Sequence, residues 1–160
     1  MNRILISIVL TGVLGLYCVS ANAASFVVGT ETQAGTITDN TTNLMWQQCS
    51  DGLSGATCAA GTAATPTWDS ALAYCESLSL GGFTDWRLPN LKELKSIADM
   101  TISNPSINAT YFPNTIASYY WSSTSYAPDT TSAWLVYFYI GSTNATNKSS
   151  TFYVRCVRGQ

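Results

Sequence analysis

The stretch that decides the fold runs from Gly81 to Ile97 and reads Gly-Gly-Phe-Thr-Asp-Trp-Arg-Leu-Pro-Asn-Leu-Lys-Glu-Leu-Lys-Ser-Ile. Pro89 keeps the residue before it extended, so a helix can begin only after it. Asn90 is a favourable N-cap, and Glu93 three residues later completes a capping box. The apolar residues that follow share one helical face: Leu91, Leu94, Ile97 and Ala98. The stretch therefore predicts a short amphipathic helix that lies on a core and serves as scaffold.

The first 23 residues have the pattern of a secretory signal peptide. A short charged start with Arg3 precedes the apolar run Ile4–Tyr17, and Ala21-Asn22-Ala23 is a small-x-small cleavage pattern. The run is shorter than the ~20 residues of a membrane-spanning helix. We favour export over a membrane anchor, and expect a single domain at 24–160 in the periplasm, at the cell surface or outside the cell, without a stable membrane span.

The composition excludes several classes of function. The chain has 7 basic residues, 9 acidic residues and no histidine. A Ser-His-Asp triad or a histidine-based metal site therefore cannot exist, and the slightly acidic balance argues against a nucleic-acid partner. No spacing among the carboxylates singles out an acid–base pair, so we expect no catalytic residue, metal site or cofactor. Abundant Ser, Thr, Asn and Tyr favour a protein or a neutral glycan as the partner.

Four cysteines remain after cleavage: Cys49, Cys58, Cys75 and Cys156. An even number in an exported protein argues for disulfides, with three pairings open. We prefer Cys49 with Cys58, which closes a short loop, and Cys75 with Cys156, which ties a helix to the last strand. The alternative, four thiolates around a metal ion, lacks a CxxC pair.

Short apolar runs predict strands near both ends of the chain: Phe26–Val28, Thr36–Thr38, Asn43–Trp46, Tyr119–Ser123, Ala133–Ile140 and Thr151–Val157. Thr67 can cap a second helix whose apolar face includes Cys75. Loops or long connections are expected at 49–65, 100–118 and 141–150. In 133–140 both faces are apolar, so either both are covered or one carries exposed aromatic residues for binding.

Several ordered motifs resemble the C-terminal domain of the Legionella collagen-like adhesin, a large bacterial family: Thr67-Trp68-Asp69, Asp85-Trp86-Arg87-Leu88-Pro89-Asn90, Tyr120-Trp121-Ser122-Ser123, Ala133-Trp134 and Val154-Arg155-Cys156-Val157-Arg158. The resemblance implies an α+β, C-type-lectin-like fold with two helices packed on a twisted antiparallel β-sheet. It also implies that the first and last strands meet. That adhesin binds sulfated glycosaminoglycans through a basic surface, and the acidic balance of this chain argues against the same ligand class here. The calcium-ligand motifs of sugar-binding C-type lectins are absent from this sequence.

The resemblance also points to a binding face. Where relatives often have Val-Asn-Phe-Asn-Asp-Gly, residues 136–141 read Val-Tyr-Phe-Tyr-Ile-Gly. Each change from Asn needs one adenine replaced, and proteins of this fold include targets of retroelements that randomise adenines near the 3′ coding end. We therefore hypothesise an adaptable, retroelement-diversified ligand-binding face, with ordinary drift as the alternative: Tyr119, Leu135, Tyr137, Tyr139, Asn144 and Asn147.

Three functions follow from these observations. The first is a secreted bacterial ligand-binding or adhesion module that recognises a protein or glycan through exposed Tyr, Asn and Ser, and that is not an enzyme. An oligomer is compatible with it. The second is a relative of the formylglycine-generating oxidases, which share the broad fold but need reactive cysteines. The third is a structural envelope protein without a dedicated ligand.

Overall fold

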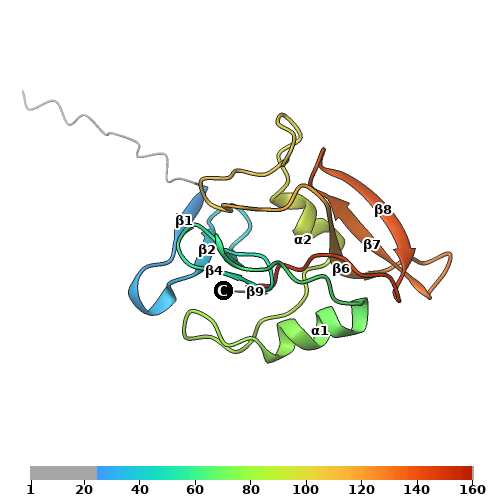
Figure 1. The fold of residues 1–160 in the computed structure, drawn as a ribbon, viewed down its shortest axis with the longest axis horizontal. Helices are drawn as coiled ribbons and strands as arrows, with labels where there is room; N and C mark the ends of the chain where they lie inside the picture. The colour runs from blue at the N-terminus through green and yellow to red at the C-terminus, as the bar shows by residue number, and fades with distance from the viewer. Residues whose placement is uncertain (1–24, 160) are drawn as a thin grey trace, which may run out of the picture.

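The computed structural model describes residues 25–159, so the predicted signal peptide at 1–23 lies outside the described residues. The fold is α+β, with two α-helices and three antiparallel sheets in this part of the chain (Figure 1). The first sheet has the order β1-β2-β3-β9 and is formed by Phe26–Val28, Thr36–Asp39, Leu44–Gln47 and Val157–Gly159. Since β9 pairs with β3, the first and last strands belong to one sheet. They form its opposite edges and do not pair with each other, so the expectation that they meet is only partly confirmed.

The second sheet has the order β6-β7-β8 and is formed by Tyr119–Ser125, Ser132–Tyr137 and Ser142–Asn147. A small hairpin, β4 (Leu53–Ser54) with β5 (Ala60–Gly61), lies within the loop predicted at 49–65. A single 3-10 turn, η1 (Glu31–Gln33), connects β1 to β2.

Both predicted helices are present: α1 spans Trp68–Ser77 and α2 spans Leu91–Ser96. The predicted capping box of α2 is confirmed. The Asn90 side chain accepts a hydrogen bond from the Glu93 backbone N–H at 2.9 Å, and the Glu93 carboxylate accepts one from the Asn90 N–H at 2.8 Å. Leu94 and Ile97 are buried beneath α2, and Cys75 is buried beneath α1, which confirms the predicted apolar faces.

Side chains alternate along β6 and β7 between two hydrophobic cores. Tyr120 and Val136 enter the first core, which α2 covers, whereas Trp121 and Leu135 enter the second core, which α1 covers. This alternation follows from the period of two along a strand. Both faces of the second sheet are therefore covered over much of their area.

The two preferred disulfides are confirmed. The Cα atoms of Cys49 and Cys58 are 5.3 Å apart, and those of Cys75 and Cys156 are 5.5 Å apart. The long bridge joins α1 to the segment that precedes β9, whereas the short one closes the loop that carries β4.

Three predictions about the C-terminal strands were wrong. The segment predicted as a polar loop at 141–150 contains β8, which pairs with β7 from Ser142 to Asn147. The predicted strand Thr151–Val157 is mostly irregular, since β9 begins only at Val157, and β7 ends at Tyr137 before the predicted end. β8 escapes hydropathy analysis because an exposed edge strand needs backbone pairing and carries polar side chains.

Candidate functional site

Three tyrosine rings stack at one end of the second sheet, and we call them the tyrosine stack. The ring centroids of Tyr119 and Tyr137 are 4.2 Å apart with planes inclined by 17°, and those of Tyr137 and Tyr139 are 5.7 Å apart at 23°. Tyr139 is 42 % exposed, whereas the other two rings are half-buried. The stack therefore joins a fixed inner end to an accessible outer end.

Strand register explains why these rings meet. Tyr119 and Tyr137 are direct partners across β6 and β7, so their side chains leave the sheet on the same side. The next pair on that side, Trp121 with Leu135, lies in the second core. Phe152 connects the two zones, because its ring is 5.6 Å from Tyr119 and 5.1 Å from Trp121. The tyrosine stack is thus the partly exposed continuation of a core-facing surface.

The structure contradicts one of the six predicted site residues. Leu135 is only 1 % exposed and packs in the second core, so it cannot contact a partner. The alternation of side chains correctly placed Leu135 on the same face as Tyr137. Its burial depends on the packing of the second core, to which α1 contributes Ala71 and Cys75 and against which Phe152 packs. The spacing of residues along the strand does not report this packing.

The two predicted asparagines lie on opposite faces of β8. Asn144 is paired with Leu135 and shares the face of the tyrosine stack, together with Ser142, the exposed partner of Tyr137. Asn147 is three residues further on and therefore points to the other side. Its side-chain oxygen accepts a hydrogen bond from the Ser149 N–H at 2.9 Å, which is a turn-forming role.

One face thus brings together four of the six predicted residues and adds two residues that were missed: Tyr119, Tyr137, Tyr139 and Asn144, with Ser142 and Phe152. Ser142 was missed because β8 was not predicted. Its pairing with Tyr137 across β7 and β8 is what places Ser142 on this face. Stacked rings cover each other's faces, so they offer mainly their edges and hydroxyl groups to a partner. This surface suits contact with a neutral polar molecule.

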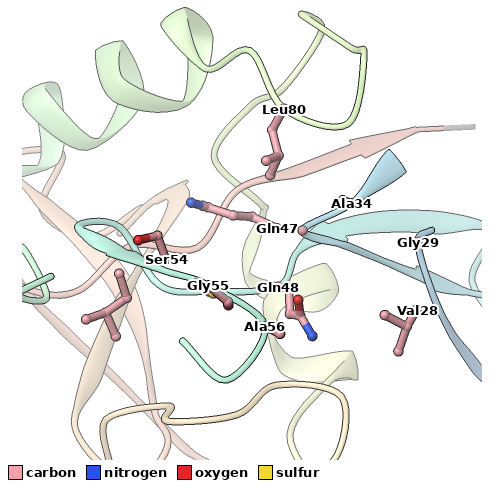
Figure 2. Close-up of a pocket in the computed structure, with 12 residues that line it drawn as sticks. Val28, Gly29, Ala34, Gln47, Gln48, Ser54, Gly55, Ala56 and Leu80 are labelled. Atoms are coloured by element: carbon pink, nitrogen blue, oxygen red, sulfur yellow. The ribbon is translucent and has the colours of Figure 1, made fainter. Parts of the chain in front are cut away.

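A cavity lies at the first sheet, apart from the tyrosine stack. It has a volume of about 460 Å³ and opens between the β1–β2 connection and the loop closed by the short disulfide (Figure 2). Its walls are mostly apolar and include Val28, Leu53 and Leu80, while Gln48 contributes an amide. Sequence analysis did not find this cavity, because its walls come from segments without a shared motif.

The arginine of the Val154-Arg155-Cys156 motif has a structural role beside this cavity. Arg155 is fully buried, and its guanidinium donates hydrogen bonds to the carbonyl oxygens of Gln47 and Gln48 and to Thr115 Oγ1, the last at 2.8 Å. Burial lowers the pKa of Arg155 from its ordinary value, since a charged group loses its hydration there. These bonds fix the backbone at the end of β3.

Within residues 25–159, no group of three Asp, Glu, Cys or His side chains is arranged to hold a metal ion. The same part of the chain contains no helix long and apolar enough to cross a membrane.

The fold and the surface together define a disulfide-bonded α+β domain with a partly exposed aromatic face. Residues 35–158 match the family model described as the Lcl C-terminal domain, so the chain belongs to this family and the resemblance is confirmed. A search of curated proteins gave no match. Family membership is consistent with a bacterial adhesion-type module, and the two disulfides are compatible with export.

Proposed function

We propose that this chain is an exported, C-type-lectin-like binding module that attaches to a protein or neutral glycan through the tyrosine stack and the adjoining face of β8. The observation that carries the proposal is the stack itself, in which Tyr139 is 42 % exposed and backed by Tyr137 and Tyr119. Rigid tyrosines provide contact area at a low cost in conformational entropy, while neighbouring Ser and Asn adapt their hydrogen bonds.

The pattern of burial supports a face adapted for contact. In the stretch where the chain departs from the family pattern, Val136 and Phe138 are fully buried, whereas Tyr139 and Ile140 are 42 % and 50 % exposed. The two departures from asparagine are Tyr137, which is half-buried, and Tyr139, which is exposed, whereas Ile140 stands where relatives have aspartate. All three positions are at least partly accessible to a partner. We propose retroelement diversification as the origin of these departures. A genome that lacks both an adenine-mismatched copy of the 3′ coding end and a neighbouring reverse transcriptase would refute this origin.

The proposal includes the absence of catalytic activity. All four cysteines within the described residues form disulfides, which removes the thiols that an oxidase-type mechanism needs. A thiol titration of the folded mature protein should therefore detect no free cysteine. A reactive pair would favour the oxidase relationship instead.

The binding test compares the wild type with a Tyr137→Ala/Tyr139→Ala variant in a glycan array and in a cell-surface adhesion assay. Loss of two contact tyrosines should weaken the strongest interaction by at least about tenfold. Tyr126→Ala is the matched control, because Tyr126 is half-buried and packs against Trp134 on the opposite face of the sheet.

Near-ultraviolet circular dichroism should show that both variants remain folded. Equal binding by the wild type and the double variant would place the contact surface elsewhere. If the wild type binds nothing in either assay, the structural envelope role becomes the better explanation.

A further inference from the structure

The cavity at the first sheet contains a side-chain amide that has no hydrogen-bonding partner among residues 25–159. Gln48 is only 7 % exposed, and Figure 2 shows its amide within the cavity, between Val28 and Ala56. The neighbouring Gln47 differs. Its Nε2 donates to the Tyr74 hydroxyl at 2.7 Å, and its Oε1 accepts from the Cys156 N–H at 3.1 Å. A buried amide that faces only a cavity is suited to bind a ligand.

The backbone that carries this amide is held firmly. The Gln48 N–H donates to the Gly35 carbonyl at 2.9 Å, and the Gln48 carbonyl accepts from the buried guanidinium of Arg155. The next residue, Cys49, is bridged to Cys58, which closes the loop that forms one wall. The amide is therefore presented by a pre-organised frame, which lowers the entropic cost of binding.

The walls define the chemistry of the ligand. None of the described residues that line the cavity is charged, and most are small or aliphatic, with Ala34, Ala56 and Leu80 as examples. A charged ligand would lose its hydration there without compensation. The group that fits is neutral and joins a small alkyl part to a hydrogen-bonding amide. A cavity of about 460 Å³ falls within the usual range for small-molecule sites.

We propose that this cavity binds the acetamido group of an N-acetylated amino sugar. The methyl group would contact the aliphatic wall, and the acetamido oxygen would accept a hydrogen bond from the Gln48 amide. The polar sugar ring would occupy the open part, near the exposed Ser54. A peptide fits less well, because β1, the strand beside the cavity, offers only three residues for backbone pairing.

The site is independent of the tyrosine stack. Figure 1 places β1 and β4, which border the cavity, on the side of the molecule away from β7 and β8. Failure of one site therefore leaves the other untouched, and the two proposals can be tested separately.

The experiment is a titration of the ¹⁵N-labelled mature protein followed by NMR. N-acetylglucosamine should shift the Gln48 side-chain amide and the backbone signals of Gly55 and Ala56, whereas glucose and glucosamine, which lack the acetyl group, should not. The Tyr137→Ala/Tyr139→Ala variant should respond like the wild type. A shift produced equally by glucose, or no shift of these signals with N-acetylglucosamine, would overturn the proposal.

Two variants test the mechanism. Gln48→Met keeps the side-chain volume but removes the amide, and should weaken binding about tenfold, the effect expected for one lost hydrogen bond. Ala56→Phe should fill the cavity from an exposed wall position and abolish binding without disturbing the core. Urea unfolding of each variant checks the fold. Unchanged binding of N-acetylglucosamine to Ala56→Phe would refute an amino-sugar site. The same conclusion would follow if the amide of acetyl-lysine bound to the protein and N-acetylglucosamine did not.

Discussion

Removal of the long disulfide should destabilise this domain far more than removal of the short one. The bridged cysteines are separated by 81 residues in Cys75–Cys156 and by 9 residues in Cys49–Cys58. A bridge restricts the unfolded chain more strongly as its loop grows. The loop lengths correspond to about 4.5 kcal/mol for the long bridge and about 2.6 kcal/mol for the short one. We therefore expect removal of the long bridge to lower the free energy of unfolding by about 2 kcal/mol more than removal of the short bridge.

Packing increases this difference. Cys75 and Cys156 are both fully buried in the second core, so replacement by alanine also leaves a small void there. A domain of this size has a free energy of unfolding of about 5 to 15 kcal/mol, and the long-bridge variant should lose a large part of it.

The assay is urea unfolding followed by tryptophan fluorescence. It compares the wild type, the Cys75→Ala/Cys156→Ala variant and the Cys49→Ala/Cys58→Ala variant. Each double variant is the matched control for the other, because both lose one bridge and neither gains a free thiol. If the short-bridge variant lost as much free energy of unfolding as the long-bridge variant, loop closure in the unfolded chain would not be the dominant effect. The reasoning would then be refuted.

Two further predictions concern charged side chains. Arg155→Lys should lower the free energy of unfolding by about 2 to 4 kcal/mol in the same urea assay, because lysine cannot make several directional bonds to the buried carbonyls. Arg158→Lys, at the ion pair with the exposed carboxylate of Asp85, should cost less than about 1 kcal/mol. Equal losses in the two variants would contradict this assignment. The hydrogen bonds from Arg87 lower the pKa of Glu93 from its ordinary value of 4.5, so its contribution to stability is complete above that value and is lost as the pH falls through the lowered pKa. The free energy of unfolding should therefore fall less steeply at acidic pH in Glu93→Gln than in the wild type. If the two plots of unfolding free energy against pH ran parallel, this role of Glu93 would be refuted.

Local sequence patterns predicted the elements that depend only on residues close together in the sequence. The capping box at Asn90 and Glu93 needs only the spacing of two residues, and the buried faces of both helices follow from their periodicity. The sequence left three pairings of the four cysteines open, and the preferred one is the pairing that the structure shows. The alternation in β7 correctly placed Leu135 and Tyr137 on one side.

Two other features, the strand β8 and the cavity, could not be predicted from neighbouring residues in the sequence. β8 carries polar residues from Ser142 to Asn147, and its backbone is ordered only because β7 offers a full row of partners. The cavity beside Gln48 exists because segments distant in sequence meet around it, and no motif links them.

By itself, the sequence determined the composition limits, the helices and the sides of the strands, because each depends on residue identity and short-range periodicity. For the cysteines it left three pairings open and favoured one, and the structure decided among them. The tertiary structure alone decided which part of a shared face is covered. Leu135 is buried in the second core, whereas Tyr137 is half-buried and Tyr139 is exposed. The physical reason is that solvent exposure depends on what packs above a residue, and long-range packing places that neighbour.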